Sequence, residues 1–218
     1  MINFKQIIHQ WSWLVLALFL TAGFIYPVAG ILALICMIAP VITAFFKGRN
    51  WCGHYCPRGS LNDQILVKLT QRSQTPAFMK TAWFKLVFLG LLMGAFMVQI
   101  IMAGGNLIAI GNVFLRMVLI TTLISIILGI IYQPRTWCMI CPMGTLAHYA
   151  ARLKTAQARI PPVVFHKSRC SDCRICSRNC PLQIDVHSFK ESGKINHPDC
   201  LKCYTCISKC PKKSLSIA

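Results

Sequence analysis

Eight of the thirteen cysteines of this 218-residue chain stand near its C-terminus, in two copies of one spacing. Both copies follow the pattern C-x2-C-x2-C-x3-C-P. The first contains Cys170, Cys173, Cys176 and Cys180, and the second contains Cys200, Cys203, Cys206 and Cys210. The short gaps allow three thiolates of one tight loop to bind three irons of a cubane. The two runs therefore predict two [4Fe–4S] clusters.

Disulfides and structural zinc are the alternatives for these cysteines. A zinc knuckle usually has a single C-x2-C pair and needs neither the third cysteine nor the terminal C-P. Residues 163–218 instead resemble a dicluster ferredoxin domain, an α+β unit in which the fourth cysteine of each run ligates the other cluster. The first cluster is then expected on Cys170, Cys173, Cys176 and Cys210, and the second on Cys200, Cys203, Cys206 and Cys180.

Composition indicates a membrane protein, because 56% of the residues are hydrophobic and only 13% are charged. Basic residues outnumber acidic ones 23 to 5, which gives a formal net charge of +18. The basic residues punctuate apolar segments, and no basic helix carries interleaved aromatic residues for stacking on bases, so nucleic acid is not an expected partner. Membrane lipid or an acidic redox partner accounts for the charge instead.

Four apolar stretches are long enough to span a bilayer, given roughly 20 residues per crossing. These predicted transmembrane helices cover about 11–26, 28–46, 82–103 and 114–132 of a membrane α-helical domain, residues 1–160. The first stretch could be a signal peptide, but it lacks a convincing cleavage site and is expected to stay as an anchor.

Lysine and arginine concentrate between Lys47 and Lys80 and again after Tyr132. The positive-inside rule then places the N- and C-termini and the middle segment in the cytoplasm. The expected location is the bacterial cytoplasmic (inner) membrane, crossed several times, with the clusters on the reducing side.

Four further cysteines lie in an internal repeat at the membrane edge. The sequence Trp51-Cys52-x3-Cys56-Pro57 is answered by Trp137-Cys138-x2-Cys141-Pro142, each at the end of a pair of spans. The four transmembrane helices are therefore expected to form two repeated hairpins. Cys52, Cys56, Cys138 and Cys141 could hold a third iron–sulfur cluster or another metal, or they could be structural or redox-active thiols on tight turns.

This plan of four spans, two Cys-Pro motifs and a C-terminal dicluster ferredoxin resembles the polyferredoxin-type membrane-bound quinol dehydrogenase family. It is similar to the four-span iron–sulfur subunit of periplasmic nitrate reductase systems and to the membrane half of proteins that support nitrous oxide reduction. The resemblance implies electron transfer between the quinone pool and a partner oxidoreductase. The second cysteine pair is one residue shorter than the first, so its metal geometry need not be the same.

Quinone is the expected substrate, because it requires an apolar slot, a hydrogen-bonding group and a nearby cluster. The candidate quinone residues are His9, Gln10, His54 and His148, since histidine can pass protons near neutral pH. No span has histidines paired for axial ligation and no C-x-x-C-H motif occurs, so haem is not expected. No catalytic residue is predicted.

The leading hypothesis is a membrane electron-transfer subunit of a multi-subunit oxidoreductase, which links quinol through iron–sulfur clusters to a partner redox protein. One alternative is a membrane-bound maturation or regulatory factor that supplies electrons to another enzyme. The other is a non-catalytic anchor whose ferredoxin domain docks a soluble complex.

Overall fold

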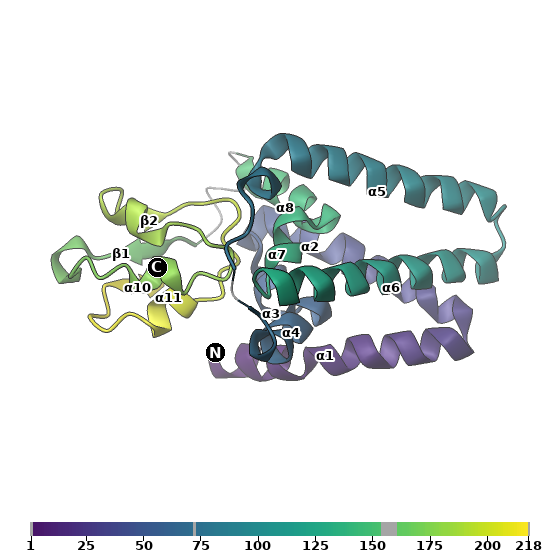
Figure 1. Ribbon diagram of the computed structural model, residues 1–218, viewed down its shortest axis with the longest axis horizontal. Helices are drawn as coiled ribbons and strands as arrows, with labels where there is room; N and C mark the ends of the chain where they lie inside the picture. The colour runs from purple at the N-terminus through teal and green to yellow at the C-terminus, as the bar shows by residue number, and fades with distance from the viewer. Residues whose placement is uncertain (1, 72, 154–160, 218) are drawn as a thin grey trace.

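The computed structural model describes residues 2–71, 73–153 and 161–217, and it is mostly helical (Figure 1). Four long helical segments run side by side. They are α1 (Ile2–Ile25), α2 (Ala33–Lys47) with the preceding 3-10 turn η1 (Pro27–Leu32), α5 (Ala82–Met102) and α6 (Leu107–Ile131). All four are long and apolar enough to cross a membrane. Leu18, Leu91 and Ile101 expose 70%, 69% and 76% of their surfaces. Lipid would cover such side chains, so these are the features of a membrane protein.

The fourth long helix starts earlier than the predicted residue 114. Gly104 and Gly105 both have positive φ and turn the chain directly after α5. Asn106 then caps α6, because its side-chain oxygen accepts from the backbone N–H groups of Ile108 and Ala109 at 2.9 and 3.3 Å. The predicted helices left residues 104–113 as a connection. The structure has only a short turn there, and the last seven of these ten residues form the start of α6.

The first long helix also begins before the predicted residue 11, at Ile2. Its polar first turns reach α4 (Pro57–Gln64), where the Ser60 hydroxyl donates to His9 O and accepts from Trp13 N at 3.2 Å. These two backbone groups would bond each other in an uninterrupted helix. The inserted hydroxyl thus anchors the start of α1 on the short helices.

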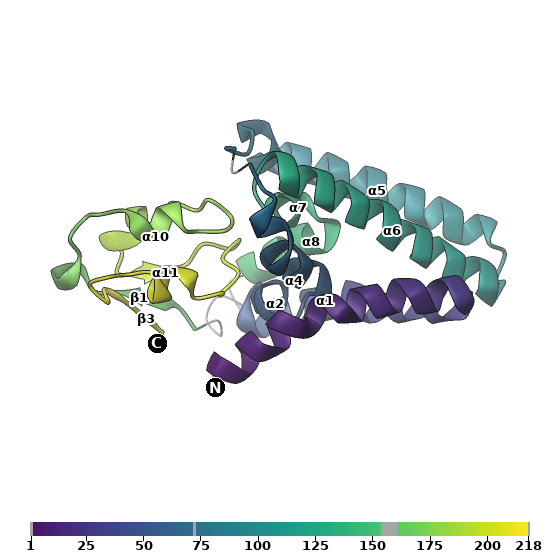
Figure 2. The same cartoon turned by 60° about the horizontal axis from the view of Figure 1, so that its bottom comes forward.

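Short helices lie between the two hairpins at one end (Figures 1 and 2). They are α3 (Asn50–His54), α4 (Pro57–Gln64), α7 (Thr136–Ile140) and α8 (Pro142–Arg152). A proline at the first turn starts α4 and α8, and the preceding cysteine is the N-cap of each. Helix α4 packs on α1 and α6, while α8 packs on α5 and α2. Such matched contacts suit two copies of one hairpin, although the duplication itself stays a prediction. The remaining turns of this half are η2 (Leu66–Lys68) and η3 (Ala77–Lys80).

The C-terminal part combines a small sheet with short helices. Strand β1 (Val163–Phe165) pairs antiparallel with β2 (Lys194–Ile195) on one side and with β3 (Leu215–Ile217) on the other. The helical pieces are η4 (Lys167–Arg169), α10 (Ile175–Arg178), η5 (Val186–Lys190) and α11 (Thr205–Ser208). Val163, Phe165, Ile195 and Leu215 form its buried core.

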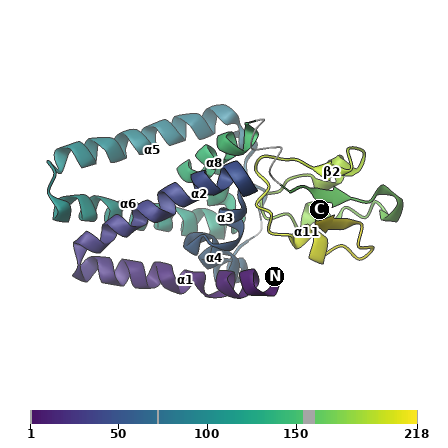
Figure 3. The ribbon, with the colours of Figure 1, turned by 180° about the vertical axis from the view of Figure 1, so that it is seen from behind.

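The N-terminus and the C-terminal domain lie at the same end of the long helices, as the views in Figures 1 and 3 agree. Residue 160, the predicted end of the membrane domain, falls outside the described residues, as does the last residue, Ala218. Which side of a membrane this end occupies stays a prediction.

The hairpins touch at the other end through two glycines. A Cβ on Gly30 would lie 2.2 Å from Gly111 O, and one on Gly111 would lie 2.0 Å from Pro27 O. Both distances are far below van der Waals contact, so this crossing of η1 and α6 requires glycine. The two hairpins together therefore have the shape of a wedge (Figure 2). Their backbones meet at one end, and the short helices separate them at the other.

We expect Gly111→Ala to destabilise the protein by about 3 kcal/mol or more, because the added methyl group must push backbone away from backbone. Gly94→Ala on α5 is the matched control, since nothing lies within 4 Å of its new Cβ. The control should be neutral or stabilising by up to about 1 kcal/mol. Thermal unfolding of the two purified variants in one detergent measures both effects, and equal stabilities would contradict the close crossing.

Candidate iron–sulfur site

The structure gathers the eight C-terminal cysteines around two cavities. One cavity is lined by Cys170, Cys173, Cys176 and Cys210. The other is lined by Cys180, Cys200, Cys203 and Cys206. These are the two sets expected from the sequence, with the fourth cysteine of each run exchanged between the cavities. Four sulfur donors around each cavity fit a [4Fe–4S] cluster.

The backbone around both cavities repeats at an interval of thirty residues. Six non-glycine residues have left-handed φ angles between 49° and 60°. Asp172, Arg174 and Gln183 surround the first run, and Lys202, Tyr204 and Lys213 occupy the equivalent places of the second. Such conformations are uncommon outside glycine and concentrate at functional sites. Alternation of left- and right-handed residues turns backbone N–H groups inward and makes an anion-binding concavity, which suits thiolates and sulfides.

Burial favours the neutral form of several of these thiols in the absence of metal. It raises the pKa of Cys206 to about 12, with the neighbouring thiols adding to the shift. It likewise raises the pKa of Cys180 to about 11, despite backbone hydrogen bonds from Ile184 and Leu182. A bound metal deprotonates a thiol outright. The cavities therefore suit thiolates whose charge is compensated by iron.

One mixed donor group sits beside the first cavity. The ligand atoms of Cys170, Asp172 and His187 all lie within 4.8 Å of one another, a set that could hold zinc. Asp172, however, already accepts from Lys190 Nζ at 2.6 Å and pairs with His187 Nε2 at 2.8 Å. These hydrogen bonds lower the pKa of Asp172 to about 2. The carboxylate is thus satisfied by protein groups and needs no metal.

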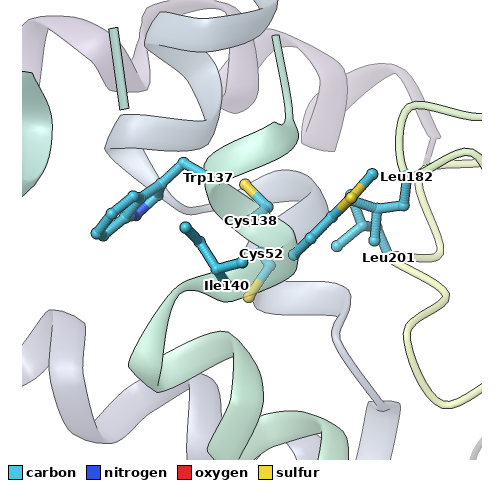
Figure 4. Close-up of a cluster of buried hydrophobic side chains, with 7 residues drawn as sticks. Cys52, Trp137, Cys138, Ile140, Leu182 and Leu201 are labelled. Carbon is cyan, nitrogen blue, oxygen red and sulfur yellow. The ribbon is translucent and has the colours of Figure 1, made fainter. Parts of the chain in front are cut away.

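The membrane-edge cysteines lie in a buried cluster that continues into the ferredoxin-like domain. Cys52 on α3 and Cys138 on α7 are 9% and 8% exposed, and Cys141 packs against the same cluster. Figure 4 shows Cys52 and Cys138 with Trp137 and Ile140 of α7 on one side and with Leu182 and Leu201 of the ferredoxin loops on the other. Cys180 and Cys203 of the second cavity pack against this cluster as well.

Cys56 completes the set. Burial and the nearby thiols of Cys52 and Cys138 raise the pKa of Cys56 to about 12. The thiols of Cys138 and Cys141 likewise reinforce the burial that raises the pKa of Cys52. The structure therefore places all four predicted cysteines close together at one end of the long helices, where their thiols affect one another's pKa.

Two buried arginines cross between the repeats at this point. Arg49 Nη2 donates to Cys138 O at 2.6 Å, and Arg135 Nη1 donates to Cys52 O at 2.7 Å. Arg135 Nη1 also lies 3.7 Å from Cys138 Sγ. Each guanidinium passes over a glycine that follows a Cys-Pro pair, where a Cβ on Gly59 or Gly144 would lie 2.5 Å from it. Both arginines are 1% exposed, so they need acceptors inside the protein.

Two carboxylates balance these arginines. Asp63 accepts from Arg135 Nε at 2.8 Å and from Nη2 at 2.6 Å, and it pairs with His9 Nε2 at 2.9 Å. Asp199 accepts from Arg49 Nη1 at 2.8 Å. Burial alone would raise the pKa of Asp63, but the charge and hydrogen bonds of Arg135, with those of His9, hold it well below its usual range. The chain has five acidic residues, so two of them serve this one region.

The four quinone candidates are placed in different surroundings. His9 joins Asp63 and Arg135, while His148 Nδ1 lies 2.9 Å from Asp199 Oδ1. His54 is 5% exposed and its ring faces Tyr204, with 5.9 Å between ring centroids. Gln10 is exposed on α1. The structure therefore does not gather them into one site, and their role in quinone binding stays a prediction.

Sequence reasoning missed Arg49, Arg135 and Arg58, although a signal was present. The internal repeat contains Arg-x-Trp-Cys twice, so an arginine stands three residues before Cys52 and before Cys138. Arg58 follows the first Cys-Pro, where the second copy has Met143. Its Nη2 donates to Thr121 Oγ1 on α6 at 2.9 Å, and its guanidinium carbon lies 5.6 Å from the centre of the Trp137 ring.

Comparison with known proteins agrees with this chemistry. A family model described as a 4Fe–4S binding domain matches residues 29–73 and again 115–159, which contain the two membrane-edge cysteine pairs. A model for a 4Fe–4S dicluster domain matches residues 162–211. No solved structure matches the chain significantly.

Three curated proteins are similar in sequence. The uncharacterised protein MJ0749 of Methanocaldococcus jannaschii is 30% identical over 194 residues, which cover 85% of this chain and 70% of the relative. MJ0750 of the same organism is 23% identical over 84% of this chain and 77% of its own length. Pyruvate synthase subunit PorD of Thermotoga maritima is 30% identical over 74 residues, which cover 34% of this chain and 71% of PorD. Together with the paired cavities, these matches make the chain an iron–sulfur electron-transfer protein.

The exchange of the fourth cysteines predicts a specific pattern of iron loss. We expect Cys170→Ser/Cys210→Ser to lose about four irons, because both residues line one cavity. Cys200→Ser/Cys210→Ser should lose about eight, because each residue lines a different cavity. Iron and sulfide analysis of the purified variants, with EPR spectra after dithionite reduction, makes the comparison. Equal losses in the two double variants would contradict the exchange.

Proposed function

The chain belongs to the same protein family as MJ0749 of Methanocaldococcus jannaschii, and from that premise and its iron–sulfur domains we propose that it passes electrons between a membrane quinone and a partner oxidoreductase. The four membrane-edge cysteines hold a third iron–sulfur cluster or another metal in this proposal. They connect the level of the lipid to the two ferredoxin cavities.

The observation that carries this proposal is the shared buried cluster at the domain junction. Cys52, Cys138 and Cys141 pack in one apolar cluster with Cys180 and Cys203, which line the second cavity. Gly53 brings the backbones together, because a Cβ there would lie 2.3 Å from Leu201 O. Packed apolar side chains thus connect Cys52, Cys138 and Cys141 with the sulfurs of the second cavity.

When bound, [4Fe–4S] clusters accept and give single electrons. Quinol oxidation releases two electrons and two protons, so the electrons must leave the quinol one after the other. The protein's own residues have to bind the headgroup and accept the protons. His9, which pairs with Asp63, is assigned the role of proton acceptor in this proposal.

Arg58 is the residue best placed to bind a quinone carbonyl. Its side chain enters the helical region, where Nη2 reaches Thr121 Oγ1 and lies 3.4 Å from Val118 O. Its Nε and the neighbouring Trp137 Nε1 are buried and have no hydrogen-bond partner among the described residues. A cation at membrane depth with spare donors marks a functional site by default. Quinone carbonyl oxygens supply the acceptor that these donors lack.

The first cavity is the expected exit towards the partner. Its ligand Cys173 is exposed, whereas the equivalent Cys203 of the second cavity is half-buried at the junction. Leu182 and Leu201 face the part of the molecule that contains the four long helices, here called the membrane half. The equivalent positions of the other cysteine run, thirty residues away, are the exposed residues Lys212 and Ser171. Exposed lysine beside an exposed ligand suits a redox partner with an acidic surface.

Replacing Cys138 tests the path. Cys138→Ser should remove the membrane-edge metal and slow quinol-driven reduction of the ferredoxin clusters by at least about 100-fold, because electrons must then cross a longer gap. The eight C-terminal cysteines are unchanged, so dithionite should still reduce both clusters. Stopped-flow absorbance with a soluble menaquinol analogue measures the rate. The control is Cys36→Ser, since Cys36 is an exposed thiol on α2. Normal iron content and rate in Cys138→Ser would refute the third site.

Replacing Arg58 tests quinone binding separately. Arg58→Met introduces the residue that the second copy carries at this position. We expect KM for the quinol analogue to rise by about tenfold or more, since a charge-assisted hydrogen bond contributes about 1.5–3 kcal/mol. Iron content and reduction by dithionite should not change. Met143→Leu is the control in the other repeat. An unchanged KM for Arg58→Met would place the quinone elsewhere.

A further inference from the structure

The two buried arginines obtain their carboxylates in different ways. Six residues after Pro57, helix α4 presents Asp63 to Arg135, and both partners belong to the membrane half. Six residues after Pro142, helix α8 has His148 at the equivalent position, which offers Arg49 no negative charge. The carboxylate for Arg49 comes instead from Asp199 of the ferredoxin-like domain.

Asp199 contacts three separate elements of the membrane half. Arg49 stands at the start of α3, Lys85 Nζ on α5 lies 3.1 Å from Oδ2, and His148 Nδ1 on α8 lies 2.9 Å from Oδ1. The Asp199 side chain is 15% exposed, and those of Lys85 and His148 are 10% and 16% exposed. An ion cluster with little access to water is sensitive to geometry, because each buried charge needs its partner.

The position of Asp199 in the chain connects this cluster to the cavities. It directly precedes Cys200, a cysteine of the second cavity, and its backbone N–H donates to His197 Nδ1 at 3.2 Å. Thirty residues earlier, the residue before Cys170 is Arg169, which is exposed. The acidic residue is therefore specific to the half of the ferredoxin-like domain that faces the membrane half.

We propose that Asp199 is a positioning residue that locks the second cavity against the membrane-edge cysteines by replacing the carboxylate missing from α8. This inference rests on the proposed electron path and adds a cause for its geometry. Without the Asp199 carboxylate, Arg49 loses its balancing charge, and the three membrane elements lose their common partner. The ferredoxin-like domain then keeps its cavities but loses its fixed position.

The test uses a cross-link that reports the position of the domain without any redox chemistry. Lys80 Nζ donates to Gln183 Oε1 at 2.8 Å across the same junction, and both side chains are accessible. In a Gln183→Glu background, a water-soluble carbodiimide should join the new carboxylate to Lys80. Mass spectrometry of the digested full-length protein quantifies the linked peptide, and EPR after dithionite confirms that both ferredoxin clusters are present.

In this background, Asp199→Asn should reduce the cross-link yield and the rate of quinol-driven cluster reduction by about tenfold or more each, because a small displacement is costly for transfer. The dithionite-reduced signals should remain. Glu191→Gln is the matched control, since Glu191 is exposed and pairs only with Lys167 among the described contacts. A wild-type cross-link yield in Asp199→Asn would overturn the proposal.

A second variant separates positioning from charge balance. His148→Asp/Asp199→Asn places a carboxylate on α8, as in the first repeat, so Arg49 is not left as an unpaired buried charge even if Asp199→Asn alone fails to accumulate. We expect this protein to fold with its full iron content but to keep the low cross-link yield. Full recovery of the yield would show that Asp199 only balances charge and would overturn the positioning role. If the parent protein cross-links but is not reduced by quinol, the proposed function fails while the position of the domain is still measured.

Discussion

The crossed pair of buried arginines is the interaction on which the arrangement at the membrane edge depends. Each guanidinium leaves one repeat and donates to the carbonyl of a cysteine in the other. A buried guanidinium without acceptors costs several kcal/mol, so neither short helix can shift without breaking contacts in its neighbour. The glycines below the two guanidinium groups are part of the same constraint, because any side chain at Gly59 or Gly144 would occupy that space. Cys52 and Cys138 are held where they are by these crossings.

The same constraint links the two halves of the molecule. The chain has few acidic residues, and the two that are most deeply placed, Asp63 and Asp199, are those that balance the crossed arginines. One is supplied by the membrane half and the other by the ferredoxin-like half. Burial would raise the pKa of Asp199, but His148 Nδ1 at 2.9 Å and the charges of Arg49 and Lys85 hold it far below its usual range. The carboxylate therefore stays ionised and can balance the charge of Arg49.

The ferredoxin-like domain shows how one backbone can present two different surfaces. Its halves share the same cysteine spacing, and residues with left-handed φ angles stand at equivalent positions thirty residues apart. Their side chains differ where they meet the surroundings, with leucines and an aspartate on the inner half and serine, lysine and arginine on the outer half. Backbone symmetry satisfies the needs of the two cavities, while side-chain asymmetry decides which cavity faces the four long helices and which faces solvent.

The sequence by itself determined the features that depend on short spacing. Two runs of cysteines predicted two sets of four ligands with Cys180 and Cys210 exchanged, and two cavities are lined by these sets, because ligand spacing in one loop is a local property. Four apolar stretches predicted four long helices, because hydrophobicity over about 20 residues is also local. The start of the fourth was misplaced, since a cap by Asn106 is decided by a few hydrogen bonds that apolar counting does not detect. Only the tertiary structure decided the partners of the buried charges. Arg49 and Asp199 are 150 residues apart in the chain, and no periodicity connects them. Their contact exists because the fold closes the ferredoxin-like domain over the short helices, where a buried charge must find its opposite.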